Sequence, residues 1–150
     1  MLTIEKFKEE HVAPVLADFR QSDKDEVWAS SRQTPEEALV TSIEASPSYC
    51  NTFLWDGVAV AIFGVAPHGD WGIPWLLATE SIGGWGKEFL PMSKVAADEM
   101  LELYPQQSNY VDSRNEKSIK WLEYIGYTIG GTEDTCVLNG ETFYRFWRYA

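Results

Sequence analysis

A glycine-rich turn between an apolar run and a long helical pattern constrains the fold of this chain more than any other segment. The apolar run is Ile73–Thr79, and the turn that follows contains Gly84 and Gly86. Apolar residues then recur at helical spacing over Lys87–Tyr104. A helix N-terminus offers free backbone N–H groups to an anion, and glycines let a phosphate approach the main chain closely. The turn therefore predicts either an anion site or a tight strand-to-helix connection that binds nothing.

A second motif, Asn115–Tyr127, follows the long helical pattern. Ile119, Leu122 and Ile125 recur at helical spacing, and Gly126 stands where a left-handed residue after the helix is expected. The motif predicts a short helix that packs against a sheet and is followed by a strand.

The remaining pattern predicts one domain over residues 1–150. Thr34 and Glu37 form a capping box, and Asp56-Gly57 and Asn139-Gly140 predict tight turns. We expect strands at 2–7, 49–55, 58–65, 73–79, 110–112, 127–131, 135–138 and 142–147, helices at 12–19, 34–46, 87–104 and 115–125, and a loop or short helical turn at 21–33. The order β-α-α-β-β-β-α-β-α, followed by the short C-terminal strands, predicts an α/β (α+β) fold, a mixed, mostly antiparallel sheet with about four helices on its faces.

Composition excludes several classes of function. The net charge of −11 argues against nonspecific nucleic-acid binding, and it fits an amine substrate, a basic partner or simple solubility. We expect no membrane span and no signal peptide, hence a cytoplasmic protein. Two cysteines and two histidines predict neither a disulfide framework nor a metal site.

The element order, with its glycine-rich turn after the fourth strand, resembles the GNAT (GCN5-related) N-acetyltransferase fold. That resemblance implies acetyl-CoA as the cofactor. It implies that main-chain groups near Leu77 and Thr79 hold the pantetheine arm. It also assigns the pyrophosphate to the N–H groups around Gly84, Gly86 and Lys87, although Lys87 is equally a solvated lysine.

The second motif resembles the matching GNAT segment in Asn115 and Ser118, which the resemblance implies are also cofactor-binding. Two positions depart from the family pattern. Ser81 replaces the usual Gln or Arg, and Leu122 stands where the family often has a tyrosine that protonates the leaving thiolate. Tyr124 points to another side of the helix and is a poor substitute.

An acyl transfer to an ammonium substrate also requires a base. Glu80 and Asp112 end neighbouring strands and are the candidate catalytic residues, with a solvated or capping carboxylate as the alternative for each. Within the loop at 21–33, Glu26, Trp28 and Ser30 are candidate substrate contacts, and Trp28 is equally a core residue.

Several short segments are similar to the sequences of a small family of GNAT-like internal virion proteins of T7-like podophages. They include Glu26–Ser30, Ile73–Leu77 and Asn109–Asn115. The resemblance implies a phage protein in the host cytoplasm or the virion, with a virion or host protein as partner. Three hypotheses stay open: an N-acyltransferase acting on a small-molecule amine or a basic protein, a catalytically degenerate interaction protein, and a CoA-binding sensor.

Overall fold

The secondary structure spans the whole chain in the computed structural model, which describes in full residues 1–82 and 87–150. The strands are β1 (Leu2–Lys6), β2 (Cys50–Trp55), β3 (Val58–His68), β4 (Trp71–Ala78), β5 (Gln106–Asp112), β6 (Thr128–Ile129), β7 (Thr135–Leu138) and β8 (Glu141–Tyr149). The α-helices are α1 (Val12–Ala17), α2 (Gln21–Ser31), α3 (Pro35–Glu44), α4 (Gly86–Leu103) and α5 (Glu116–Tyr124), with short 3₁₀ helices η1 (Glu9–His11), η2 (Glu80–Trp85) and η3 (Thr132–Asp134).

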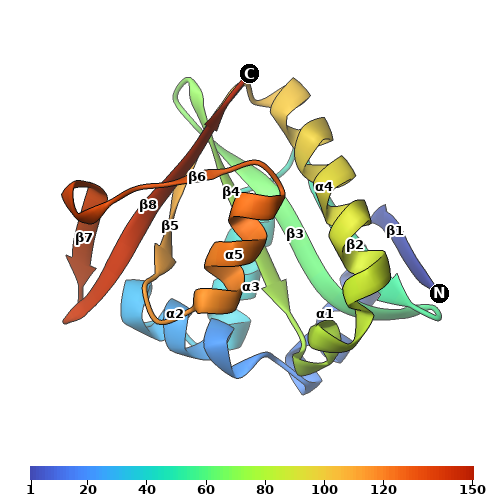
Figure 1. The fold of residues 1–150 in the computed structure, drawn as a ribbon. Helices are drawn as coiled ribbons and strands as arrows, with labels where there is room; N and C mark the ends of the chain where they lie inside the picture. Colours follow the sequence, from blue (N-terminus) through green and yellow to red (C-terminus); the bar gives the residue numbers. More distant parts are fainter.

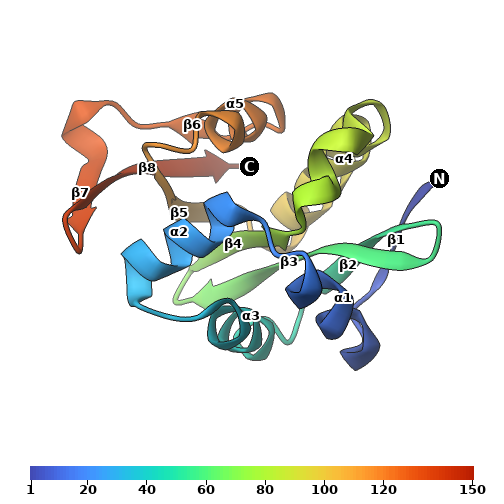
Figure 2. The same cartoon turned by 90° about the horizontal axis from the view of Figure 1, so that it is seen from below.

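One mixed sheet forms the centre of the molecule, with the order β1-β2-β3-β4-β5-β8-β6 and with β7 paired to β8. Every pairing is antiparallel except that of β4 with β5. Helices α4 and α5 cover one face, and α1, α2 and α3 cover the other (Figures 1 and 2). The predicted fold class is confirmed.

Three apolar clusters hold these layers together. One packs α4 on the first half of the sheet through Phe53, Phe89 and Met100, and a second packs α1 and α3 on the opposite face. The third packs α5 on β5 and β8 and contains Leu122 and Phe146. The sheet is therefore covered on both faces, as its apolar strands require.

Local signals of the sequence are found where they were predicted. Thr34 and Glu37 exchange both capping hydrogen bonds at the start of α3. Asp56 and Asn139 adopt positive φ angles of 47° and 52° in the turns before β3 and β8. Gly126 has a φ of 112° directly after α5, a conformation that favours glycine. No helix within the described residues is long and apolar enough to cross a membrane.

The segment 21–33 differs from the prediction because Gln21–Ser31 forms a complete helix. Its sequence has no apolar stripe, and the side chains that it buries are those of Asp23 and Ala29. Polar contacts to the sheet hold this helix in place, together with Val27, which packs against the cluster of α1 and α3. The part of the chain that the structure describes consequently has five α-helices instead of about four.

Candidate active site

Strands β4 and β5 run parallel but pair only at Gly72 and Gln107, and beyond that point they diverge. A Cβ atom added to Gly72 would lie 2.6 Å from Val65 Cγ1 and 2.9 Å from Tyr104 Cβ. The missing side chain thus lets the end of α4 pack directly on the vertex where the strands meet. The opening starts just beyond this vertex.

The side chain of Asn109 occupies the gap where the next pairing would occur. Its Oδ1 accepts the backbone N–H of Tyr110 at 2.8 Å, and its Nδ2 donates to the carbonyl of Pro74 at 2.8 Å. Pro74 has no N–H with which to continue the ladder. The amide therefore satisfies both strands while keeping their backbones apart.

Backbone groups of β4 face the widening opening. The N–H of Ala78 points away from β3, because it donates to a side chain of α2. Since strand positions alternate, Leu76 also turns its N–H and C=O toward the opening, where strand pairing has ended. Leu76 thus presents a donor and an acceptor at the edge of the cleft.

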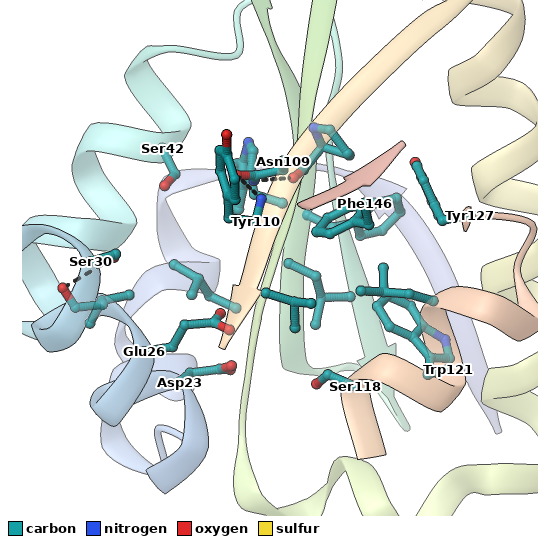
Figure 3. A pocket seen from close by; sticks show the side chains of 18 of the residues that line it. Asp23, Glu26, Ser30, Ser42, Asn109, Tyr110, Ser118, Trp121, Tyr127 and Phe146 are labelled. Carbon is teal, nitrogen blue, oxygen red and sulfur yellow. Dashed lines mark hydrogen bonds between the residues drawn. The ribbon is translucent and has the colours of Figure 1, made fainter. Parts of the chain in front are cut away.

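Two carboxylates from α2 close the wide end of the opening, one on each strand (Figure 3). Asp23 Oδ2 accepts the N–H of Ala78 in β4 at 2.9 Å. Glu26 Oε1 accepts the N–H of Asp112 in β5 at 2.8 Å. The two acids lie three residues apart on one face of α2, which places both side chains over the cleft.

These two acids differ in their charge partners. Arg20 binds Asp23 through both Nε and Nη2, at 3.1 Å and 2.7 Å. Burial nevertheless raises the pKa of Asp23 above its ordinary value. Glu26 forms no salt bridge within the described residues; burial raises its pKa to about 7, and the charges of Asp23 and Asp112 act in the same direction. Glu26 is consequently a carboxylate poised to exchange a proton near neutrality.

A cavity of about 310 Å³ passes between β4 and β5 beside Glu26. On the side of α2 and α3, its wall includes Ser30, Ser42, Asn109 and Tyr110 (Figure 3). On the side of α4 and α5, its lining residues include Ser93, Ala96, Met100, Ser118, Trp121 and Tyr127. The cavity therefore joins the two faces of the sheet, and two reactants could meet in it from opposite sides.

Asp112 and Glu80, the candidate bases, take part in structural contacts. Arg114 binds Asp112 in a bidentate ion pair and, despite burial, lowers the pKa of that carboxyl below its ordinary value. Asp112 contributes its backbone N–H to the site through Glu26. Glu80 is exposed and accepts the backbone N–H of Gln21 at the start of α2.

Leu77 and Thr79, whose main-chain groups were expected to hold the pantetheine arm, direct those groups toward β3 instead. The N–H of Thr79 donates to Val60 at 3.0 Å, and Leu77 lies opposite Ile62 at a position that faces β3. Leu76 and Ala78 present their backbone to the opening instead. Leu77 lines the cavity with its side chain.

The structure describes three of the five cofactor-binding residues expected at the N-termini of α4 and α5. Gly84 and Gly86 lie outside the described residues, and Lys87 is exposed near the start of α4. Asn115 caps α5 by accepting the N–H of Ser118 at 3.3 Å, and Ser118 lines the cavity. Asn115 and Ser118 are thus brought to the α5 end of the opening.

Of the expected substrate contacts, Glu26 and Ser30 line the cavity, whereas Trp28 does not. The Trp28 side chain is 53% exposed and carries the Arg32 guanidinium over its ring at 5.1 Å. Trp28 is therefore no core residue. It lines a neighbouring groove between α2 with its connection to α3 and the β7–β8 turn.

The helix α5 presents no hydroxyl at the position of Leu122, which is buried and lines the cavity. Tyr124 is 47% exposed on another side of α5. Trp121 instead spans α5 and α4, stacking on Phe89 with 5.6 Å between ring centroids and donating to Ser93 Oγ at 3.0 Å. Trp121 thus fills the space between these helices.

The sequence analysis did not predict a place in the candidate site for four residues, Asp23, Asn109, Leu76 and Trp121. The spacing of Asp23 and Glu26 would have indicated a shared helix face, had the segment been predicted as a helix. Asn109 carries no such signal, because its role depends on the geometry of two strands that are distant in sequence. Within the described residues, no group of three or more potential metal ligands occurs.

Solved structures share this architecture. An N-acetyltransferase from Staphylococcus aureus matches with a TM-score of 0.69 and 16% identity, covering 99% of this chain and 98% of that chain. A Bacillus subtilis acetyltransferase solved in complex with CoA matches at 0.62 and 11%, covering 100% and 99%. A GNAT-family acetyltransferase from Streptococcus pneumoniae matches at 0.62 and 13%, covering 100% of both chains. The chain therefore has the GNAT fold.

Comparison by sequence gives no further assignment. No protein-family model matches the chain, and no curated protein matches it. At these identities the structural likeness extends to the fold and leaves the chemistry to be argued from the site.

Proposed function

We propose that this protein is an acyl-CoA-dependent N-acyltransferase in which Glu26 is the general base. The observation that carries the proposal is the position of the Glu26 carboxylate. It lies at the wide end of the cleft, beside the cavity, with no salt bridge to a described residue and with a pKa raised to about 7. A base with such a pKa can accept a proton from an ammonium ion near neutral pH.

The donor side of the cavity has the polar groups that acetyl-CoA needs. The cleft-facing N–H and C=O of Leu76 offer a strand edge to the amide groups of the pantetheine arm. Asn115 and Ser118 mark the N-terminus of α5, and the sequence motif assigns the phosphates to Gly84, Gly86 and Lys87. The donor supplies a thioester, whose C–S bond breaks as a C–N bond forms to the amine.

The ammonium group loses two protons during transfer, one to the Glu26 carboxylate and one to the leaving thiolate. The ammonium proton passes to Glu26 and on to water, and the second proton of the amine leaves with the thiol. Because a thiolate is a fair leaving group, the absence of a hydroxyl at Leu122 lowers the rate without preventing transfer. Most of the acceleration comes from holding the two reactants in one cavity.

A second candidate function has one observation in its favour. Trp121 fills the space between α4 and α5, and Leu122 replaces the family's acid. Both features fit a catalytically degenerate GNAT-fold protein. The resemblance of its sequence to podophage internal virion proteins would then place it in the host cytoplasm or the virion, with a virion or host protein as partner.

Two measurements test the proposal and separate it from this alternative. Acetyl-CoA at about 100 times its dissociation constant should stabilise the protein by about 2.7 kcal/mol, and Gly86→Glu should remove that shift. Release of free thiol on addition of amines should then depend on Glu26, and Glu26→Gln should slow it by about 10²–10⁴ while keeping the thermal shift. Binding of acetyl-CoA without thiol release over a broad amine panel would favour the degenerate protein. No thermal shift at millimolar acetyl-CoA would refute the enzyme.

A further inference from the structure

We propose that the acceptor is a small primary amine with a hydroxylated, uncharged body, such as an amino sugar, and that α2 excludes peptide acceptors. This inference rests on the proposed function, because it names the substrate of the same cavity. The inference is based on the residues that line the cavity on the side of α2 and α3. It is also based on the hydrogen bonds that hold α2 across this side.

The wall on this side offers neutral hydrogen-bonding groups. Ser42 and Tyr110 line the cavity, and their hydroxyls make no hydrogen bond to the described residues (Figure 3). Ser30 Oγ is only weakly engaged, with 3.5 Å to the carbonyl of Val27. Such hydroxyls can donate to and accept from the hydroxyls of a ligand.

An aromatic side chain also contributes to the cavity wall. Trp75 lines the cavity, and its Nε1 donates to Ser46 Oγ at 2.7 Å, which fixes the plane of the indole. A fixed indole gives a flat apolar face on which the C–H groups of a sugar ring can pack. The combination of flat ring and neutral hydroxyls matches a cyclic polyol better than a linear aliphatic chain.

The charged residues that line the cavity limit the acceptor to a molecule with a single ammonium group. Among the described lining residues the charged groups are Arg20, Asp23 and Glu26, and Arg20 and Asp23 neutralise one another. Glu26 is left as the single carboxylate that can hold an ammonium group. A polyamine would bury a second ammonium without a partner, which is costly.

Helix α2 is fastened at both ends across the acceptor side. At its start, the N–H of Arg20 donates to the carbonyl of Ala78 in β4 at 2.8 Å. At its end, Asn139 Nδ2 in the β7–β8 turn donates to the carbonyl of Ala29 at 2.8 Å, and the neighbouring Leu138 lines the cavity. Figure 2 shows α2 in front of the ends of β4 and β5, where Asp23 and Glu26 contact the two strands. A peptide lying across this side would have to displace α2 or the β7–β8 turn.

The size of the cavity agrees with a small acceptor. Its volume of about 310 Å³ is shared by both reactants. Ligand pockets commonly measure about 300–1,000 Å³, so this one lies at the lower limit. A single sugar ring and the reacting end of an acyl donor fill such a space.

The test compares amines in the thiol-release assay with acetyl-CoA. We expect glucosamine to give a higher kcat/KM than spermidine or a peptide with N-terminal alanine. The matched control is cyclohexylamine, which has the same ring size and no hydroxyls. Ser42→Ala should raise KM for glucosamine by roughly tenfold per lost hydrogen bond, and leave that for cyclohexylamine unchanged. A peptide or spermidine as the preferred substrate, or an equal effect of Ser42→Ala on both ring amines, would overturn the inference.

A binding measurement keeps this inference separate from the proposed function. Saturation-transfer NMR with glucosamine alone requires no turnover, and we expect a signal that Ser42→Ala weakens. If glucosamine binds in this way but no amine releases thiol, the enzyme fails and the ligand class stands. If an alanine peptide or spermidine binds and glucosamine does not, or if none of them binds, the ligand class fails.

Discussion

Glu26 of α2 accepts the backbone N–H of Asp112 in β5, with 2.8 Å between Oε1 and N. The bond joins a helix that the sequence barely indicates to the free edge of a diverging strand. It places a half-buried carboxylate at the point where the cleft is widest. Burial favours the protonated form of Glu26, whereas the Asp112 N–H favours the ionised form, so the titration of this side chain affects both stability and chemistry.

The stability of the protein should fall as the pH rises through the range in which Glu26 loses its proton. The pKa of Glu26 is about 7 in the folded protein against an ordinary value of 4.5. Between these pH values the folded state binds more protons than the unfolded state, so the folded state loses stability as the pH rises. Glu26→Gln keeps an acceptor for the Asp112 N–H and removes this loss. Urea unfolding should show the variant more stable than the wild type at pH 8, by up to about 3 kcal/mol, with the difference shrinking toward pH 5.

Removing Asp23 should destabilise the protein strongly. Asp23→Ala leaves the Arg20 guanidinium and the Ala78 N–H without their partner, and breaking a buried pair in this way costs about 3–5 kcal/mol. Asp23→Asn keeps an oxygen for both donors and should cost clearly less. Equal losses in the two variants, measured by urea unfolding, would show that the bonds to Ala78 and Arg20 contribute little.

Asn109 should be needed to keep the two strands apart. Asn109→Ala removes both hydrogen bonds at the vertex and should lower the free energy of unfolding by about 1–3 kcal/mol. Asn109→Asp is the matched variant, because a carboxylate can accept from Tyr110 but cannot donate to Pro74. It should also be destabilised. A neutral Asn109→Ala would contradict the role of the amide as a spacer.

Gly72 should tolerate no side chain. Gly72→Ala places a Cβ 2.6 Å from Val65 Cγ1 and 2.9 Å from Tyr104 Cβ, and overpacking of this kind costs about 1–3 kcal/mol. Gly131→Ala is the control, since a Cβ there meets no atom within 4 Å. Thermal unfolding should show a lower Tm for the first variant only, and similar midpoints for both would be inconsistent with close packing at the vertex.

Most of the fold could be predicted from the sequence because its local signals are strong. The capping box at Thr34, the turns at Asp56 and Asn139, and the left-handed Gly126 all depend on residues within a few positions of one another. Helix α2 was missed for the opposite reason. Its apolar periodicity is absent, and its contacts run to Ala78 and Asp112, which are far away in the sequence.

The candidate site was predicted less well than the fold. Glu26 was expected as a substrate contact, and only its burial and the nearby carboxylates of Asp23 and Asp112 indicate a base. Asp112 looked like a base by position, but the ion pair with Arg114 stabilises its charged form. Charge pairing and desolvation depend on neighbours that only the folded structure brings together.

The pH profile of acetyl transfer tests the central claim, that Glu26 is the general base, most directly. With cyclohexylamine as the amine, whose ammonium group titrates at about 10 as that of lysine does, kcat/KM of the wild type should rise through an apparent pKa of about 7 as Glu26 loses its proton. In Glu26→Gln, this step should vanish and the rate should fall by about 10²–10⁴, while acetyl-CoA still shifts the Tm. A Glu26→Gln enzyme with unchanged rates, or with the same step near pH 7, would contradict the assignment.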